Sequence, residues 1–247
     1  MIAIIFAAGI GSRLKPFTDH HPKALAEVAG KPAIAHAIDK ILGSGIERLV
    51  VNVHHFADQI EAYVRTNYPQ ADISFSDERA LLLDTGGALA KISRECLEGY
   101  TGPVLVHNAD IVTDFPLAPM IEAHEHTGAD ATILVDPERQ STRRFMFDAD
   151  NRLHGWVNLT TGATRPDGFS PDDYAPASFG GMHIISHNTL KDIDRYCGVE
   201  LKPFSITNYY LDRCQQLNIC GYTPAKPFRW HDIGDPAKLA AAQADFA

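Results

Sequence analysis

Apolar residues recur along the first half of the chain in two alternating patterns. Short apolar runs have the length of strands, and longer segments space apolar residues three or four apart, as helices do. The predicted strands are Ile2–Phe6, Arg48–Val53, Asp72–Phe75, Pro103–Val106 and Ala131–Val135, and the predicted helices are Pro32–Gly43, Ala57–Val64, Gly86–Leu97 and Leu117–His126. This alternation predicts an α/β fold: a Rossmann-like, open, mainly parallel sheet with helices on both faces.

The second half of the chain follows a different pattern. Arg144–Phe147 and Leu153–Val157 flank a turn-forming Asp-Ala-Asp-Asn stretch, which predicts a small antiparallel hairpin. Glycine, proline, aspartate and threonine dominate residues 162–176, so we expect a long loop or flap there. The remaining predicted elements are a strand at Gly181–Ile185, a helix after Asn188, a helix at Ile206–Gln216, a strand at Ile219–Tyr222 and a final helix at Pro236–Phe246.

Composition and charge narrow the class of protein. Hydrophobic residues make up 45% of the 247 residues, enough for one large domain, and the formal net charge is −9. An acidic chain disfavours nucleic acid or an anionic membrane as the main partner. The four cysteines form no CxxC pair, no apolar stretch approaches the length of a membrane span, and no basic residues precede the first apolar run. We expect a cytoplasmic protein, and homo-oligomerisation stays open.

The first predicted strand runs into a glycine loop, in the sequence MIAIIFAAGIGSRLKPF. Ligands of open α/β sheets bind beyond the carboxyl ends of strands, where Gly9 and Gly11 lie. A dinucleotide-binding loop needs a third glycine where Leu14 stands, and a Walker loop needs a glycine–lysine pair that is absent here. A simple turn leaves the cations Arg13 and Lys23 unexplained. The favoured interpretation is a loop that binds the phosphates of a nucleoside triphosphate.

The same loop carries a family resemblance. Residues 6–14, followed by Pro22-Lys23-Ala24-Leu25, resemble the LAAGxGxRL loop and PKxL motif of the sugar-1-phosphate nucleotidyltransferases. Further matching blocks follow in family order: Gly30-Lys31-Pro32, Asp84 to Ala88, Asn108-Ala109-Asp110, Phe179-Gly180-Gly181 and Trp230 to Gly234. Ala109 departs from the glycine often found there, but the carboxylate after it is kept. The blocks span nearly the whole chain, which resembles the short members of the family.

The resemblance implies transfer of a nucleoside monophosphate from a nucleoside triphosphate to a sugar 1-phosphate, with release of pyrophosphate. The product would be an NDP-sugar, with UDP favoured, of the kind used as a cell-wall or polysaccharide precursor. It assigns catalysis to Arg13, Lys23 and Asp110, and a bound Mg²⁺ to Asp110 and Asp232. Its nucleotide-binding residues are Ala7, Ala8, Gly9, Gly11, Ser12, Thr85, Gly86, Gly87 and Asn108, and its sugar-phosphate-binding residues are Phe179, Gly180, Gly181 and Asn208.

The chemistry of such a reaction suits these residue types. The attacking phosphate is already ionised near neutral pH, so the catalyst must mainly position two anions and offset their charge. Mg²⁺ prefers carboxylate oxygens and keeps several waters, so two aspartates suffice to hold it. We expect residues 1–247 to form a single domain, with 1–135 binding the nucleotide and 136–247 binding the sugar phosphate.

Several alternatives stay open. The same loop would serve a guanylyl- or cytidylyltransferase acting on mannose or heptose phosphate or on phosphocholine. A non-catalytic nucleotide-sugar sensor is a second class, which the retained Arg13, Lys23, Asp110 and Asp232 disfavour. The twelve histidines show no i, i+4 pair on a helix, which disfavours a zinc hydrolase. Asp232 could instead cap the last helix, although Asp235 before Pro236 suits that role better.

Overall fold

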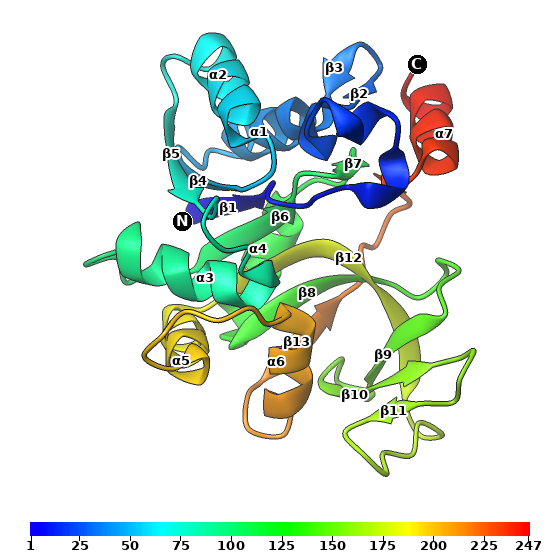
Figure 1. Ribbon diagram of the computed structural model, residues 1–247. Coiled ribbons are helices and arrows are strands. Elements are labelled where there is room, and N and C mark those ends of the chain that lie inside the picture. The colour runs from blue at the N-terminus through cyan, green and yellow to red at the C-terminus, as the bar shows by residue number, and fades with distance from the viewer.

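The computed structural model describes all 247 residues. The chain forms one large twisted sheet with helices packed against it (Figure 1). Ten strands form this sheet, in the order β11-β10-β9-β12-β6-β1-β4-β5, with β8 pairing β12 and β13 pairing β8. Its strands are β1 (Ile2–Phe6), β4 (Arg48–Val53), β5 (Asp72–Asp77), β6 (Val104–Asn108), β8 (Ala131–Asp136), β9 (Arg143–Phe147), β10 (Leu153–Asn158), β11 (Thr164–Arg165), β12 (Ala175–Ile185) and β13 (Ile219–Tyr222).

The other elements surround this sheet. Two small sheets pair β2 (Glu27–Val28) with β3 (Lys31–Pro32) and β7 (Ile111–Thr113) with β14 (Trp230–Asp232). The helices are α1 (Ala33–Gly43), α2 (Ala57–Asn67), α3 (Asp84–Glu95), α4 (Ala118–Thr127), α5 (His187–Cys197), α6 (Ile206–Arg213) and α7 (Pro236–Phe246). Three short 3₁₀ turns follow β1: η1 (Ser12–Leu14), η2 (Phe17–Asp19) and η3 (Lys23–Leu25). No helix in the chain is long and apolar enough to cross a membrane.

The N-terminal half of the sheet is parallel, as the sequence pattern predicts. β1 lies between β4 and β6 and runs parallel to both, and β5 continues the parallel order beyond β4. Ile4 and Ile5 are fully buried because both faces of β1 are covered. Alternate residues of a strand point to opposite faces, so Ile4 joins one core layer and Ile5 the other. The predicted α/β fold with helices on both faces is confirmed.

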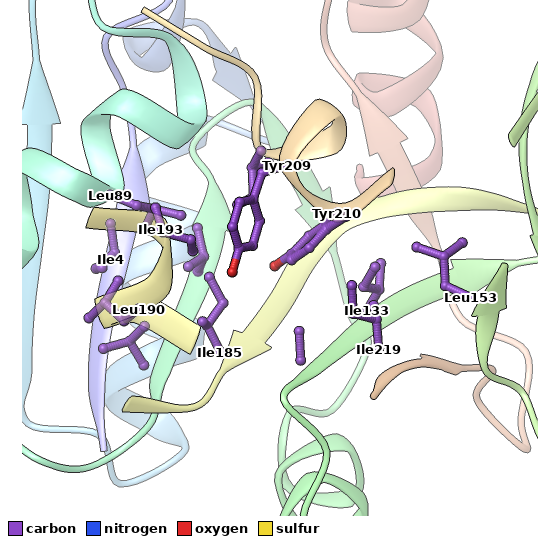
Figure 2. Close-up of a cluster of buried hydrophobic side chains, with 14 of the residues drawn as sticks. Ile4, Leu89, Ile133, Leu153, Ile185, Leu190, Ile193, Tyr209, Tyr210 and Ile219 are labelled. Carbon is purple, nitrogen blue, oxygen red and sulfur yellow. The ribbon is translucent and has the colours of Figure 1, made fainter. Parts of the chain in front are cut away.

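The two core layers recruit different helices. On one face α1, α2 and α4 pack over Ile5 and its neighbours. On the other face α3, α5 and α6 pack over Ile4 (Figure 2). Figure 2 shows this layer, with Leu89, Leu190, Ile193, Tyr209 and Tyr210 from the helices against Ile4, Ile133 and Ile185 from the strands.

The second half builds the antiparallel annex. β9 and β10 form the predicted hairpin, and β11 extends it by pairing with β10. β12 begins six residues before the predicted Gly181, inside the expected flap, and pairs with β6, β8 and β9. Its early part contains proline, serine and glycine, which lowers strand propensity, so only pairing with its neighbours makes it a strand. A register shift between Phe179 and His183 bends it from the annex into the main sheet.

Candidate active site

The strand order places a cleft at the carboxyl end of β1. The chain leaves β1 toward β4 and β5, then crosses to β6 on the other side of β1. Loops after β1 and β6 therefore diverge, which is where open α/β sheets bind ligands. The last residue of β1, Phe6, pairs with Asn52 on one side and Asn108 on the other.

A cavity of 420 Å³ lies at this edge. We call it the first cavity. Five of the predicted nucleotide-binding residues line it: Ala7, Ala8, Gly9, Thr85 and Asn108. Lys23 and Asp110 line it as well, together with Phe6, Ala24, Asn52, Glu78, Leu82, Asp84, Ala109 and Pro203. The glycine loop, the lysine and the aspartate, far apart in sequence, therefore meet at one cavity.

Gly11 has a left-handed backbone conformation and packs tightly against Lys23 and Thr18. Its φ is +67°, and an added Cβ would lie 2.9 Å from both Cβ of Lys23 and Cγ2 of Thr18. The hydroxyl of Thr18 donates a hydrogen bond to the Gly11 carbonyl at 2.9 Å. Gly11 and Ser12 do not line the cavity. Only glycine adopts this conformation readily and lets the loop close on Lys23.

A chain of buried polar contacts fixes the floor of the first cavity. The Ala7 amide donates to Oδ1 of Asn52 at 2.7 Å, and Nδ2 of Asn52 donates to Oε1 of Glu78 at 2.8 Å. The Leu83 amide donates to the other Glu78 oxygen at 3.0 Å. Burial raises the pKa of Glu78, and the hydrogen bonds from Leu83 and Asn52 only partly offset this. The loop after β1 is thus tied to the turn after β5.

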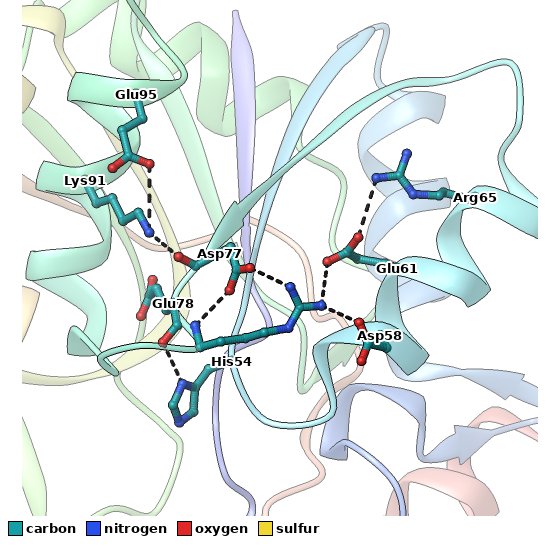
Figure 3. A network of polar contacts seen from close by, with 9 residues as sticks. His54, Asp58, Glu61, Arg65, Asp77, Glu78, Lys91 and Glu95 are labelled. Carbon is teal, nitrogen blue, oxygen red and sulfur yellow. Dashed lines mark hydrogen bonds and ion pairs between the residues drawn. The ribbon is translucent and has the colours of Figure 1, made fainter.

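Charged side chains hold the turn that carries Glu78 from outside (Figure 3). His54 contacts the Glu78 carbonyl at 2.7 Å, while Arg79 forms ion pairs with Asp58 at 2.6 Å and with Glu61 at 3.0 Å. Each exposed pair contributes little free energy, but together they restrict the turn between β5 and α3. The Glu78 carboxylate itself is held by Asn52 and the Leu83 amide.

Lys23, Asp110 and Asp232 form a compact cluster beside the first cavity. The Lys23 ammonium donates a hydrogen bond to Asp110 and lies 3.7 Å from Oδ1 of Asp232. The Lys23 side chain is 11% exposed, whereas the Asp110 and Asp232 side chains keep 31% and 23% of their surface accessible. One fixed cation therefore lies between two carboxylates that can reach a ligand.

The β7–β14 pair brings the second aspartate to the first. Asp110 precedes β7, Asp232 ends β14, and the antiparallel register pairs Asp232 with Ile111. The Ile233 amide donates to the Asp110 carbonyl at 3.0 Å. Asp235 caps α7 by accepting from the Lys238 amide, so Asp232 is not the helix cap. His231 contacts Asp245 at 2.8 Å.

Neighbouring cations stabilise the ionised form of Asp232. Burial raises its pKa, but a 2.6 Å hydrogen bond from Lys238 and the charges of Lys23 and Lys238 outweigh burial and leave the pKa below its usual value. A Cβ added to Gly234 would lie 2.7 Å from Oδ1 of Asp232 and 3.1 Å from Nη2 of Arg13. Arg13, otherwise exposed, thus reaches the Asp232 side of the cluster.

The carboxylate pair fits a divalent metal that keeps other ligands. No group of three histidine, cysteine or acidic side chains is arranged to hold a metal by itself. Two aspartates sharing one ammonium suit Mg²⁺, because Mg²⁺ takes one or two carboxylates and completes its shell with water and substrate phosphates. The residues present therefore fit the predicted Mg²⁺, and Asp110 and Asp232 would hold it.

Gly86 and Gly87 serve packing in this structure. Their amides donate to the Phe204 carbonyl at 2.8 and 3.3 Å. A Cβ on Gly86 would lie 2.3 Å from the Phe204 ring. Thr85 lines the cavity, and its hydroxyl accepts from the Ile206 amide at 2.9 Å. A nucleotide contact from the two glycines stays a prediction.

A second cavity, of 520 Å³, lies over the annex. Its lining includes the predicted Phe179 and Asn208, whereas Gly180 and Gly181 lie outside it. The Gly180 carbonyl accepts from the Trp230 indole at 2.8 Å. Arg165 lines this cavity and donates to Asn208 at 2.5 Å.

The comparisons with known proteins agree with this geometry. A family model described as nucleotidyl transferase matches residues 2–145, more than half of the chain. The chain belongs to the nucleotidyl transferase family. It is 33% identical to the N-acetylmuramate alpha-1-phosphate uridylyltransferase of Caulobacter vibrioides, over 100% of this chain and 97% of that protein. It is also 33% identical to mannose-1-phosphate guanyltransferase beta-B of Xenopus laevis, covering 96% of this chain but only 62% of that one.

Solved structures share the fold. HddC from Yersinia pseudotuberculosis, crystallised with GMP-PN, superposes with a TM-score of 0.75 at 22% identity, covering 100% of this chain and 99% of that one. A putative glucose-1-phosphate thymidylyltransferase from Bacillus anthracis gives a TM-score of 0.73 at 20% identity, covering 99% and 94%. The family and the fold are therefore those that the sequence motifs predict.

Several residues of the two cavities escape the sequence motifs. Asn52 and Glu78 lie in the first cavity, and Arg139, Arg143, Trp156 and Asn158 in the second. Asn52 could have been singled out from the sequence, because it is a polar residue inside an otherwise apolar predicted strand. Arg139 and Arg143 could not have been singled out, because a charged residue before or within a hairpin is ordinarily solvated.

Proposed function

We propose that the protein transfers the uridylyl group of UTP to a sugar 1-phosphate, releasing pyrophosphate and forming a UDP-sugar. The single observation that carries the proposal is the meeting of the glycine loop with Lys23, Asp110 and Asp232 beside one cavity. Family membership supports nucleotidyl transfer. The Caulobacter relative, nearly equal in length, supports the uridylyl group.

The residues divide the work in a way that the reaction needs. Ala7–Gly9 line the first cavity without bulky side chains. The Ala7 amide is bonded to Asn52, so phosphates can approach the amides of Ala8 and Gly9 closely. Lys23 places a cation where charge must be offset, and Arg13 adds a planar donor from the Asp232 side. Mg²⁺ held by Asp110 and Asp232 would supply further charge on the α-phosphate and the sugar phosphate. No general base is required, because the nucleophile is already ionised.

The two cavities also support the proposed division of the domain. Every residue that lines the first cavity, apart from Pro203, lies within 1–135, and every residue that lines the second lies within 136–247. The nucleotide would occupy the first cavity and the sugar the second. The Lys23–Asp110–Asp232 cluster lies beside the first cavity, and Trp230 connects β14 to the carbonyl of Gly180 on β12.

A guanylyltransferase is the second candidate function. It rests on the mannose-1-phosphate guanylyltransferase relatives, three of which are also 33% identical to this chain. The chain spans about three fifths of their length, so the shared part concerns the catalytic fold. A sensor without catalysis is disfavoured, because a sensor needs neither the paired carboxylates nor the ammonium between them.

A pyrophosphate-release assay tests the proposal. UTP, GTP, CTP, dTTP and ATP are each combined with a panel of sugar 1-phosphates, with Mg²⁺ and with EDTA. N-acetylmuramate 1-phosphate is the first sugar to include, because the Caulobacter relative is named for it. We expect Mg²⁺-dependent release that is greatest with UTP. Greatest release with GTP would favour the second candidate, and release with no pair would refute nucleotidyl transfer.

A further inference from the structure

The second cavity is built on one face of the annex. In the antiparallel register Arg143 pairs with Asn158, and Trp156 pairs with both Phe145 and Arg165. Directly paired residues of antiparallel strands point to the same face. Alternate residues of one strand also share a face, so these five side chains form one surface. The start of α6 contributes Ser205, Thr207 and Asn208 to the same cavity.

This surface is strongly positive for so acidic a protein. Three arginines, Arg139, Arg143 and Arg165, line the cavity, and no aspartate or glutamate does. The chain as a whole has 31 acidic against 22 basic residues. A local excess of guanidinium groups in such a protein indicates an anionic ligand, because arginine binds carboxylate and phosphate oxygens with paired donors.

Arg139 lines the cavity and packs on Trp230, two residues before the predicted metal ligand Asp232. Its guanidinium carbon lies 3.9 Å from the centre of the Trp230 ring, and it donates to the Phe179 carbonyl. Its Nη1 is buried and has no hydrogen-bond partner. An unpaired buried donor on a charged group costs free energy, which a bound anion would offset.

Arg144 holds Arg139 in place. Buried Arg144 donates to the carbonyls of Arg139 and Pro176, each at 3.0 Å, and to that of Pro137. The Ser178 hydroxyl also donates to the Arg139 carbonyl, at 3.2 Å. The segment that carries Arg139 and leads into β9 is therefore fixed before any ligand binds, which favours a specific site over a flexible loop.

One anion does not account for three arginines spread over this surface. The 1-phosphate must reach Lys23, Asp110 and Asp232 for the reaction, which places it at the Trp230 side, next to Arg139. Arg143 and Arg165 stand on β9 and β11 of the annex, whereas β14 pairs with β7 in a separate sheet. The rings of Phe145, Trp156 and Phe179 offer the apolar surface on which the C–H faces of a sugar ring pack.

We propose that the second cavity takes an acidic sugar 1-phosphate, one that carries a carboxylate in addition to its anomeric phosphate, and that Arg143 binds this carboxylate. The inference rests on the proposed function and narrows its substrate class. Asn158 pairs with Arg143 in the register and can donate to the same anion. Arg165, tied to Asn208, borders the site.

Two matched substrate pairs test the proposal with the intact protein. N-acetylmuramate 1-phosphate differs from N-acetylglucosamine 1-phosphate by a lactyl carboxylate, and glucuronate 1-phosphate differs from glucose 1-phosphate by a carboxylate at C6. We expect the acidic member of at least one pair to have a kcat/KM about 10-fold or more above its neutral partner, since a hydrogen-bonded charge contributes on that scale. Equal or better use of both neutral sugars would overturn the proposal.

Variants of Arg143 test whether this residue causes the preference for the acidic sugar 1-phosphate. Arg143→Gln should raise KM for the preferred acidic sugar about 10- to 100-fold and leave the neutral partner's kcat/KM within about 3-fold, while Arg143→Lys should restore part of the loss. Arg195→Gln, at an exposed arginine on α5 outside both cavities, is the matched control. An equal loss with both sugars, or an unchanged preference, would overturn the role of Arg143.

The two proposals fail in different ways. A protein that turns over only neutral sugar 1-phosphates keeps the proposed function and loses this inference. A protein that releases no pyrophosphate with any pair loses both.

Discussion

The two cavities differ in what would hold their ligands. The first is lined by the Ala7–Gly9 loop, by carboxylate and amide side chains and by the buried Lys23. The second is lined by arginines, aromatic rings and polar side chains from the annex and from α6. Triphosphate is common to every nucleotide donor and can be bound by backbone amides, whereas a sugar must be distinguished by side chains. The difference supports the proposal that the parallel half binds the nucleotide for the reaction and that the antiparallel half distinguishes the sugar.

Asp110→Asn should have the largest effect and so gives the strongest test of this division. It removes a predicted metal ligand next to the first cavity without changing core volume. We expect pyrophosphate release to fall at least about 100-fold, a barrier increase of roughly 3 kcal/mol, with unchanged folding. Steady-state assays and a thermal melt measure the two effects. Asp72→Asn, on the far end of β5, is the control, and near-normal turnover in Asp110→Asn would remove the metal assignment.

A pH titration of stability tests the scaffold that joins the cavities. His107 on β6 is fully buried, and burial lowers its pKa to about 4. Below pH 6.5 the unfolded chain binds a proton that the folded protein excludes, so stability is complete above 6.5 and falls as the pH drops toward 4. The contribution is about 3 kcal/mol by this linkage.

The variant His107→Leu separates this contribution from general acid unfolding. Urea melts at pH 7, 6, 5 and 4 should show a free energy of unfolding that declines less steeply than in the wild type. His126→Leu, an exposed position on α4, should leave the slope unchanged. Identical slopes in wild type and His107→Leu would mean that the imidazole is protonated in the folded state.

Lys23→Ala should lower activity by a smaller factor than the aspartate change. It removes the cation between Asp110 and Asp232, which leaves Asp110 without its ion-pair partner while Asp232 keeps Lys238. We expect kcat/KM for UTP to fall about 10- to 100-fold, since one charged contact contributes roughly 1.5–3 kcal/mol. Lys15→Ala, in the same loop but exposed and paired with Asp19, is the control. Unchanged kinetics in Lys23→Ala would make the ion pairs purely structural.

Alanine substitution at two glycines of the nucleotide-binding motifs should have different effects, one on stability and the other on UTP binding. Gly86→Ala would place a Cβ 2.3 Å from Phe204 and should cost about 1–3 kcal/mol of stability through overpacking. Gly9→Ala meets nothing within 4 Å and should leave stability within about 0.5 kcal/mol. Because Gly9 lines the cavity, Gly9→Ala should instead raise KM for UTP. Chemical denaturation and kinetics of both variants check the contrast, which a destabilised Gly9→Ala would break.

More of the first cavity than of the second could be predicted from the sequence, for a physical reason. β1, β4, β13 and α7 appear at their predicted boundaries, because continuous apolar runs and the Asp235-Pro236 start mark them clearly. The glycine loop and Asp110 follow β1 and β6, and parallel strands bring their carboxyl ends to one edge. The local sequence pattern and the position of these residues at strand ends were therefore enough to predict that the glycine loop and Asp110 meet at one site.

The annex depends on long-range pairing that local pattern does not show. β12 becomes a strand through Phe179 because β8 and β9 pair with it, despite glycine and proline in its sequence. The surface that holds Arg143 and Trp156 exists only after β9, β10 and β11 align. The predicted strand at Gly181–Ile185 therefore began too late, and Arg139 and Arg143 of the second cavity were not anticipated.

The most direct test of the two-cavity account is a crystal structure of the protein with its UDP-sugar product and Mg²⁺. The account predicts the uridine between Ala7–Gly9 and Thr85, the diphosphate at Lys23, Asp110 and Asp232, and the sugar on the annex face at Arg143. A nucleoside outside the first cavity, or a sugar that makes no contact with the second, would contradict it.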